Sequence, residues 1–469
     1  MSALSLCVHG HFYQPPRENP FSGTIPAEPG ATPFGNFNEK IHDECYKPNV
    51  DLGNFQLMSF NLGPTLARWI QKRFPSTHAQ IVNSDHYHQH TFGQGNGMAQ
   101  AYNHTILPLA AHRDKVTQIA WGITDFHHRF GHHPQGMWLP EMAVDMDTLE
   151  VMYDQGLRYT ILTPEQVRLP DGGAVPRSSQ LYYVQLSNGH RFTLFLRDQR
   201  LSNRLAFDPE MTQNATRFAQ WCRETVAADA GLFLIATDGE TFGHHQPLRQ
   251  FFLQAFLRSE AAKVGFEVTT PAKYMGAHPA TQRVLLNENT AWSCAHGVDR
   301  WQSGCTCTSG DTRWKPRLRA AFDRLAGSVD ALYQSACAGW IGDPWALRDA
   351  YINVILGRTG GIELLEQFSS SPIDHHTAAS LLHLLEAERY CQAMYTSCGW
   401  FFDDLKRIEA RNNIAYAAMA VRQVELATAV DATAGINLAG AFRDDLAAAK
   451  SGVTAETGRE IYDAILAGR

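Results

Sequence analysis

Two short segments of this chain each place a carboxylate directly after an apolar run. One segment reads Trp-Leu-Pro-Glu and ends at Glu141, and the other carries Asp238 between the run Leu232–Ala236 and Gly239. Cleavage of a sugar acetal requires two such groups, because one protonates the leaving oxygen while the other attacks or stabilises the anomeric carbon. Two carboxylates at expected strand ends therefore indicate chemistry on a glycosidic bond.

Each of these residues also fits a structural role when it is taken alone. Glu141 could be a surface residue of a loop, and Asp238 could cap the N-terminus of a helix. His9 and His11 close the first apolar run and lie on the same side of an extended chain. They could bind a metal or sugar hydroxyls, or they could be hydrogen-bonded histidines of the core.

The elements that must position these residues alternate between strands and helices over the first 275 or so residues. This alternation predicts a parallel sheet that is closed, or nearly closed, into a barrel, with its active face at the carboxyl ends of the strands. We expect helices over Asn61–Arg73 and Asp145–Gln155. The expected strands are Leu4–His9, Gln80–Ser84, Gly136–Leu139, Tyr159–Leu162, Leu181–Gln185, Phe192–Phe195 and Leu232–Ala236.

The character of the sequence changes near Ala291, where a loop rich in Cys, Trp and Gly leads into Ala- and Leu-rich helical patterns. We expect three parts: a catalytic barrel over residues 1–275, a connecting loop region over 276–312, and a helical domain over 313–469 that covers the cleft. The expected helices are Trp314–Cys337, Pro344–Leu356, Ala378–Tyr395, Phe401–Ala427 and Asn437–Lys450.

Composition excludes several classes of partner. The 469 residues carry a formal net charge of -7 without a basic stripe, which argues against a nucleic-acid partner. The longest apolar runs are too short to span a bilayer, so no membrane partner is expected. Nine cysteines in mostly apolar contexts, and an N-terminus without the pattern of a signal peptide, predict a cytoplasmic location with free thiols.

Together these motifs resemble glycoside hydrolase family 57, which acts on α-glucans. The likeness covers most of the chain, and in one segment Asn203 stands where the family pattern has Asp. The segments that carry it are His9 to Pro15 (His-x-His with Gln-Pro), Tyr102 to Leu109 (Tyr-x-His-x-Ile-Leu-Pro-Leu), Trp138 to Glu141 (Trp-x-Pro-Glu), Phe195 to Asp198 (Phe-x-Arg-Asp) with Leu201-Ser202, and Asp238 to Glu240 (Asp-Gly-Glu). A helical region of a subgroup of the family resembles Trp292 to Val298 and Met394 to Phe402.

The resemblance implies an α/β fold, a distorted (β/α)7 barrel followed by an all-helical C-terminal domain. It implies a retaining mechanism with Glu141 as nucleophile and Asp238 as general acid/base, which places the two carboxyl groups roughly 5–5.5 Å apart. Asp238 must start protonated, so its pKa should be raised. No cofactor is expected, and the expected partner is an α-glucan or maltooligosaccharide. The residues expected to bind substrate are His9, His11, Gln14, His104, Trp138, Arg197, Glu240, His244, Trp292, His296 and Trp400.

The Cys-rich loop raises the question of a metal. Cys294, His296, Cys305 and Cys307 supply four ligand types that zinc prefers within one short loop. Their C-x-H and C-x-C spacings are tighter than the common C-x-x-C knuckle. Close packing of reduced thiols, with His296 lining the cleft, is the alternative.

Two other function classes stay open at this point. Asp85, His86 and His90 follow an expected strand and could serve a metal-dependent carbohydrate deacetylase, although that leaves Glu141 and Asp238 without a role. A catalytically inactive glycan-binding protein is the other alternative. Within the preferred class the sequence does not separate hydrolysis, glucan transfer and branching, nor does it fix linkage, chain length or oligomeric state.

Overall fold

The computed structural model of the protein describes residues 4–226, 230–430 and 437–468. These residues form two compact units that are interleaved in the sequence. The first, here called the barrel unit, comprises the chain up to Gln14 together with Ala27–Ala101 and Phe126–Trp292. The second, the helical unit, comprises Pro15–Pro26, Tyr102–Asp125 and the chain from Ser293 onward. The division into 1–275, 276–312 and 313–469 stays a prediction about folding domains.

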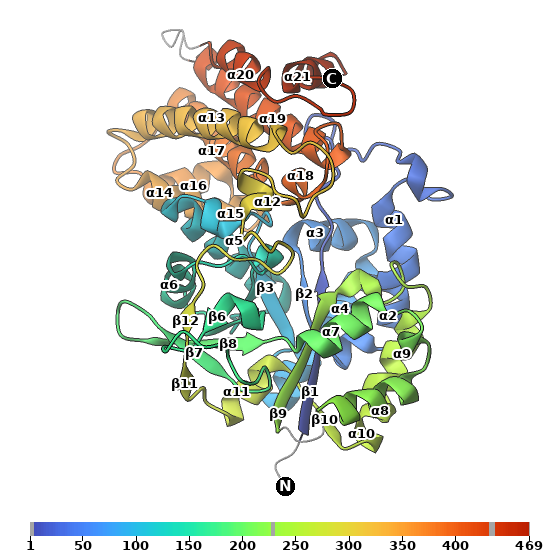
Figure 1. The fold of residues 1–469 in the computed structure, drawn as a ribbon. Helices are drawn as coiled ribbons and strands as arrows, with labels where there is room; N and C mark the ends of the chain where they lie inside the picture. Colours follow the sequence, from blue (N-terminus) through green and yellow to red (C-terminus); the bar gives the residue numbers. More distant parts are fainter. Residues whose placement is uncertain (1–3, 227–229, 431–436, 469) are drawn as a thin grey trace. The chain divides into compact units, whose positions relative to one another are not determined.

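Among the described residues, seven parallel strands close into a ring in the barrel unit (Figure 1). Around the ring the order is β9, β1, β2, β3, β4, β5, β8 and back to β9, with single bridges at Gly136–Tyr159 and Arg197–Leu234. The predicted fold class, a distorted (β/α)7 barrel with a helical C-terminal region, is thereby confirmed. These strands are β1 (Leu4–Phe12), β2 (Ser59–Leu62), β3 (Gly97–Gln100), β4 (Met137–Trp138), β5 (Tyr159–Leu162), β8 (Arg191–Leu196) and β9 (Gly231–Asp238).

Shorter strands extend the barrel at its edges. β10 (Phe266–Val268) pairs with the start of β1, and β7 (Tyr182–Gln185) forms an antiparallel pair with β8. β11 (Gln282–Arg283) adds to β7, while β6 (Val167–Arg168) pairs with β12 (Leu285–Leu286). The long strand β1 is buried along nearly its whole length, which suits a parallel strand covered on both faces.

Helices connect the strands and cover the barrel. Pro64 opens α3 at a position where its missing N–H costs nothing, and Asp145 caps α6 by accepting a hydrogen bond from the Thr148 amide. The helix α5 (His112–Phe130) contributes residues to both units. The others of this part are α1 (Phe37–Ile41), α2 (Lys47–Asp51), α3 (Pro64–Arg73), α4 (Pro75–Phe92), α6 (Met146–Asp154), α7 (Gln199–Phe207), α8 (Ala215–Thr225), α9 (Arg249–Ala255), α10 (Ala261–Lys263) and α11 (Pro271–Ala277).

One predicted strand was wrong. Gln80–Ser84 lies inside α4, which runs for eighteen residues from Pro75 and ends at Gly93 in the left-handed conformation. Only two of its five residues are aliphatic, so this run fits a helix as well as a strand. Between Pro75 and Gly93 the sequence contains no Gly or Pro, which favours one continuous helix. The strands β2, β3, β6, β10, β11 and β12 were missed because each is at most four residues long, and β2 and β3 also carry polar side chains into the barrel.

The helical unit is built around three long helices that pack along one another, α13, α17 and α19 (Figure 1). The predicted helix Trp314–Cys337 coincides with α13. The expected helix Phe401–Ala427 is interrupted, because Asp404 leaves the helical path and accepts hydrogen bonds from the Gly452 and Val453 amides. The helices are α12 (Asp299–Gln302), α13 (Trp314–Cys337), α14 (Pro344–Ala350), α15 (Ile352–Ile355), α16 (Gly361–Phe368), α17 (His375–Ala393), α18 (Cys398–Phe401), α19 (Ile408–Val430), α20 (Leu438–Leu446) and α21 (Gly458–Ala467).

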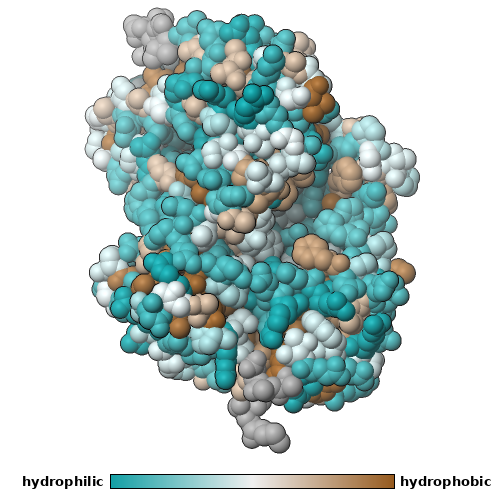
Figure 2. Space-filling model, viewed as in Figure 1, coloured by the Kyte–Doolittle hydropathy of each residue, from teal (hydrophilic) through white to brown (hydrophobic). Residues whose placement is uncertain are grey.

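The face of the molecule drawn in Figure 2 is mostly hydrophilic, with hydrophobic residues in small separate groups. Large exposed apolar side chains such as Phe207 and Phe251 are scattered among the elements. Within the described part of the chain, no helix combines the length and the apolar character needed to cross a membrane.

Candidate active site

The strand register brings polar residues side by side at the carboxyl ends of the barrel strands. His11 on β1 pairs with Asp238 on one side and with Asn61 on the other. Further around the ring, Gln100 at the end of β3 pairs with Trp138 at the end of β4. Because all these strands are parallel, their last residues meet at one end of the barrel, where such folds carry their active sites.

Glu141 stands three residues beyond β4 in a strained turn. Pro140 stops the strand, and both Glu141 (φ 57°) and Met142 (φ 48°) adopt the left-handed conformation. Non-glycine residues in this region cost about 1–3 kcal/mol each, so the surrounding structure must impose the turn. The Trp292 amide does so by donating to the Glu141 carbonyl at 3.0 Å. Strain of this kind is concentrated at functional sites.

A chain of contacts leads from Glu141 to Arg197. The Trp292 Nε1–H donates to a Glu141 carboxylate oxygen at 3.1 Å, and the Arg197 guanidinium lies over the Trp292 ring at 5.6 Å from its centroid. Arg197 also donates to the Asn203 side-chain oxygen at 2.5 Å. At the position where the family pattern has Asp, Asn203 therefore offers a neutral acceptor to the same guanidinium.

Asp238 is the exposed last residue of β9, so a ligand and water can reach it. The protein around the carboxyl group still removes much of its hydration, and this loss raises its pKa to about 7. The negative charge of Glu141 raises the pKa further, and the positive charge of Arg197 opposes the rise. The next residue, Gly239, has no room for a side chain, because a Cβ there would lie 2.4 Å from the Phe12 ring.

The two histidines of β1 are buried at this end of the barrel, where both rings pack against Trp138. His9 is fully buried, and its ring nitrogens bond to Ser59 (3.0 Å) and Asn61 (3.1 Å). The Trp138 indole stacks on the rings of His9 and His11, with centroids 5.0 and 4.8 Å away. Burial lowers the pKa of His9 to about 4 and that of His11 to about 3, so both are neutral at physiological pH.

Glu240 is a buried carboxyl group behind Asp238. It accepts hydrogen bonds from the Tyr46 hydroxyl at 2.7 Å and from the Tyr13 amide at 3.2 Å. Burial raises the pKa of Glu240 to about 8, and the charge of Asp238 adds to the rise. Hydrogen bonds with the side chains of Tyr46 and Gln14 lower the pKa and so oppose the rise. Since only 2% of Glu240 is exposed, it is placed to position its neighbours rather than to meet a substrate.

The remaining residues expected to bind substrate are His244, His104, His296 and Trp400. His244 belongs to the barrel unit and bonds to Glu44 at 2.6 Å. His104, His296 and Trp400 belong to the helical unit. There His104 is buried against the Ser397 hydroxyl at 2.7 Å, and Trp400 is fully buried. The barrel unit by itself brings together Glu141, Asp238, Arg197, Trp138, Trp292, His11, Gln14 and Glu240.

Sequence reasoning missed two residues that support this site. Asn61 joins His9, His11 and Gln100 through its side chain, and Tyr46 holds Glu240. The predicted helix Asn61–Arg73 includes Asn61, but the structure places Asn61 in β2 and starts the helix at Pro64. Gly63 and Pro64 are the sequence signal for this boundary. No local pattern points to Tyr46, which lies 194 residues from Glu240.

The residues of the alternative metal site do not come together. Asp85, His86 and His90 lie within α4 and not after a strand. The fully buried Asp85 carboxylate accepts from the Gly97 amide and bonds to His132 at 2.6 Å, while His86 bonds to the Phe130 carbonyl. In the described part of the chain these residues form no metal-binding group.

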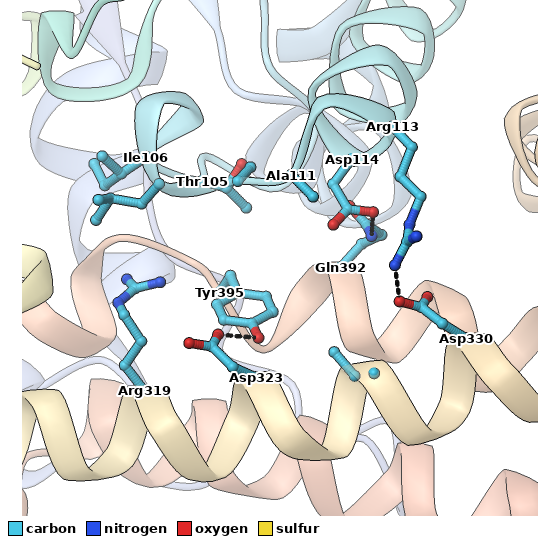
Figure 3. Close-up of a pocket in the computed structure, with 14 residues that line it drawn as sticks. Thr105, Ile106, Ala111, Arg113, Asp114, Arg319, Asp323, Asp330, Gln392 and Tyr395 are labelled. Atoms are coloured by element: carbon cyan, nitrogen blue, oxygen red, sulfur yellow. Dashed lines mark hydrogen bonds and ion pairs between the residues drawn. The ribbon is translucent and has the colours of Figure 1, made fainter.

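A cavity of about 310 Å³ lies within the helical unit, apart from the carboxylate pair (Figure 3). Its charged groups are largely paired with one another: the Tyr395 hydroxyl donates to Asp323 at 2.7 Å, and Arg113 pairs with Asp330.

A parallel barrel that presents two carboxylates beyond its strand ends is an arrangement typical of glycoside-cleaving enzymes. Comparison with known sequences assigns the chain to one family within that class. A profile of glycosyl hydrolase family 57 matches residues 34–287, more than half of the 469 residues. The chain therefore belongs to glycosyl hydrolase family 57, as the sequence motifs predict. Residues 311–469 match a domain of unknown function, DUF3536.

Individual relatives are distant. α-Amylase 1 of Dictyoglomus thermophilum is 24% identical over 251 residues, which are 51% of this chain and 34% of that relative. The chain thus spans about a third of that curated relative. Among solved structures, an exo-type maltose-forming amylase of Pyrococcus sp. ST04 matches 99% of this chain and 91% of its own, with a TM-score of 0.73 and 14% identity. A branching enzyme of Pyrococcus horikoshii matches 95% and 94%, with a TM-score of 0.64 and 14% identity. These structural matches show that the fold is shared.

Proposed function

We propose that this protein is a retaining enzyme that cleaves α-glucosidic bonds of α-glucans and passes the glycosyl group to water or to another sugar. Glu141 is the nucleophile and Asp238 is the general acid/base. The observation that carries the proposal is the pKa of Asp238, about 7, next to the charge of Glu141. A carboxyl group whose pKa is raised by burial and by the charge of a second carboxylate is what an acid paired with a nucleophile requires.

In the first step the Glu141 carboxylate attacks the anomeric carbon as Asp238 transfers its proton to the leaving glycosidic oxygen. The glucosyl group then forms an ester with Glu141, and the leaving sugar carries a free hydroxyl. Esterification removes the charge of Glu141, and with it the repulsion that helps to raise the pKa of Asp238. Asp238 is then a carboxylate able to take a proton from the incoming water or sugar hydroxyl, which attacks the anomeric carbon and releases Glu141.

The surroundings of the two carboxylates suit a sugar. Trp292 is half-buried and offers an aromatic ring beside Glu141, to which it is hydrogen-bonded. The buried Nε1–H of Trp138 has no partner among the described residues, and a sugar hydroxyl or a water would satisfy it. The names of the relatives, an α-amylase, a maltose-forming amylase and a branching enzyme, favour α-glucans as the substrate class.

Chemical rescue tests the two roles separately. An aryl α-glucoside with a good leaving group needs no proton, so Asp238→Ala should still form the glycosyl-enzyme, and azide should accelerate turnover to an α-glycosyl azide. In Glu141→Ala, azide enters from the vacated face and should yield the β-glycosyl azide. NMR of the products reads the configuration. Rescue with the same configuration in both variants, or with the two configurations exchanged, would overturn the assignment.

Glu210→Gln and Asp171→Asn provide matched controls, because both residues are exposed in the barrel unit and outside the site. They should keep the activity of the unmodified enzyme. Loss of activity in the controls would show that charge alone, and not these two positions, governs turnover.

Product sizing separates water from sugar as the acceptor. The enzyme is incubated with maltooligosaccharides and amylose, and both chain lengths and new reducing ends are measured. Hydrolysis raises the number of reducing ends, whereas transfer redistributes chain lengths without raising it. Binding of glucans with no change in products would instead favour the inactive glycan-binding protein and reject the proposal.

A further inference from the structure

The loop at the start of the helical unit gathers four metal-ligating side chains. The ligand atoms of Cys294, His296, Cys305 and Cys307 all lie within 4.8 Å of one another. The sulfurs of Cys294 and Cys305 are 3.4 Å apart, and the Cys307 sulfur is 3.4 Å from Nδ1 of His296. A disulfide would require about 2.05 Å between sulfurs, so these are free thiols.

We propose that this loop binds one zinc ion through Cys294, His296, Cys305 and Cys307. With Zn–S near 2.3 Å and Zn–N near 2.05 Å, a tetrahedron has S···S edges of about 3.8 Å and S···N edges of about 3.6 Å. The Cys294–Cys305 and Cys307–His296 separations fall within about 0.4 Å of those edges, and no pair exceeds them by more than about 1.2 Å. The ligand atoms therefore need only small side-chain adjustments to surround an ion.

Backbone amides of the loop point toward two of the four ligand atoms. The amides of His296 and Arg300 donate toward the sulfur of Cys294, and the amide of Ala295 donates toward that of Cys307. The short helix α12 separates the two ligand pairs, and the Gly304 amide closes it by bonding to the Asp299 carbonyl at 2.7 Å. Outer hydrogen bonds of this kind hold ligands in place around a metal.

Two buried cations, Arg300 and Lys315, lie beside the cluster. Three thiolates and one Zn²⁺ leave a net charge of −1. Arg300 donates to the Cys307 carbonyl at 3.2 Å and is only 8% exposed. Lys315 is fully buried and donates to the Arg300 carbonyl at 3.1 Å. A buried lysine without a counter-charge would be costly, and an anionic metal cluster provides one.

The ligand set also indicates what the ion does. Three thiolates and one imidazole fill all four positions of a tetrahedral zinc, so no position is left for water or substrate. The site is therefore structural, and its role is to tie Cys294 and His296 to Cys305 and Cys307. This inference is independent of the proposed reaction, because the test below measures metal content rather than turnover.

The first experiment measures metal in the full-length protein purified under reducing conditions without added zinc. We expect about one zinc ion per chain by elemental mass spectrometry. Replacement by Co²⁺ should give the visible bands of tetrahedral cobalt and a near-ultraviolet sulfur-to-cobalt charge-transfer band. Less than about a tenth of an equivalent of zinc, or an equivalent of iron in its place, would overturn the proposal.

The second experiment uses paired variants. Cys305→Ser and Cys307→Ser should each lose most of the bound zinc and the charge-transfer band. Cys398→Ser is the matched control, since it is another incompletely buried cysteine of the same unit, and it should keep both. Equal zinc in all three variants contradicts the site. Should the Ser variants unfold, the cobalt spectrum of the unmodified protein still decides, because it reports thiolate ligands directly.

Discussion

Two carboxyl groups with raised pKa values, Asp238 in the barrel unit and Glu388 in the helical unit, differ in what surrounds them. Burial raises the pKa of both. Glu388 is fully buried and bonds to Arg348 at 2.9 Å, and Arg348 opposes the rise. Asp238 is exposed at a strand end, and the charged groups that act on it are the Glu141 carboxylate and the Arg197 guanidinium.

The difference teaches that a raised pKa alone does not mark a catalytic acid. Glu388 belongs to a closed ion-pair network, in which Arg348 also bonds to Asp114 at 2.9 Å. Glu388 has no surface exposed to solvent. Asp238 combines the raised pKa with access and with a like charge that changes during the proposed reaction, and this combination fits a proton donor.

The largest expected effect contrasts the two carboxyl groups directly. Asp238→Asn should lower kcat/KM on α-glucans by roughly 10²–10⁴-fold, because the leaving oxygen loses its proton donor. Glu388→Gln should leave the activity of the folded protein close to that of the unmodified enzyme. Initial rates on amylose, corrected for the folded fraction from circular dichroism, measure both.

The reverse pattern would break the comparison. If Glu388→Gln abolishes turnover in folded protein while Asp238→Asn does not, access is not what separates the two groups. Glu141→Gln tests the other carboxylate of the barrel site, and its kcat/KM should fall on the order of 10⁴-fold or more.

The second prediction concerns stability. Arg348→Met leaves Glu388 and Asp114 without their shared cation in a buried place, and it should destabilise the helical unit by about 3–5 kcal/mol. Replacing both members, Arg348→Met with Glu388→Leu, should recover much of that loss, because the fully buried carboxylate is gone and only the partly exposed Asp114 lacks its cation. Urea unfolding followed by circular dichroism measures the three proteins. A double variant less stable than Arg348→Met would show that packing, not charge, dominates.

The positions of Glu141 and Asp238 at strand ends were predictable from sequence because their signals are local. Glu141 follows Pro140 at a strand end, and Asp238 follows a clear strand and precedes a glycine. The ring of strands followed from the alternation of apolar runs and helices, even though two of its seven strands, β2 and β3, were missed and part of α4 was misread as a strand. The roles of Glu141 and Asp238 stay predictions that the experiments above test.

What could not be predicted depends on contacts between distant segments. Arg348 and Glu388 are 40 residues apart, and neither stands in a recognisable motif. The segment Tyr102–Asp125 lies in the helical unit although it falls between barrel strands in the sequence. His104 carries a family motif, yet its partner Ser397 is 293 residues away. Periodicity describes single elements and contains no information about such pairings.

The third prediction uses Arg197 to shift the acid. Arg197 favours the ionised form of Asp238, so Arg197→Met should raise the pKa of Asp238 and move the basic limb of the kcat/KM profile to higher pH, by about one unit or less. Arg197→Lys keeps the charge and should move the limb less. Arg204→Met, which removes an exposed arginine of α7, is the matched control and should leave the limb in place. A shift to lower pH in Arg197→Met would contradict the sign of the interaction.

The smallest expected effect concerns the stability of the folded protein, which ionised Asp238 should lower. Its pKa of about 7 in the folded protein exceeds the value of about 3.9 expected for an unfolded chain. Ionisation of Asp238 therefore lowers the free energy of unfolding. This loss is absent below about pH 4, where the group is protonated in both states; it grows as the pH rises and is complete above about pH 7. Asp238→Asn removes this cost, so its melting temperature should exceed that of the unmodified protein at pH 8 and by less at pH 5.

Because Asp238 is exposed, water screens part of the penalty, and the rise should be roughly 1–2 °C. Scanning calorimetry at both pH values measures it, and Asp171→Asn in the same unit should show no such dependence on pH. A melting temperature lowered by Asp238→Asn at pH 8 would mean that the carboxylate stabilises the fold, as a paired structural group does. Asp238 would then resemble Glu388, and the distinction between an accessible acid and a closed ion pair would fail. If Asp238 serves chemistry at the expense of stability, Asp238→Asn should raise the melting temperature more at pH 8 than at pH 5.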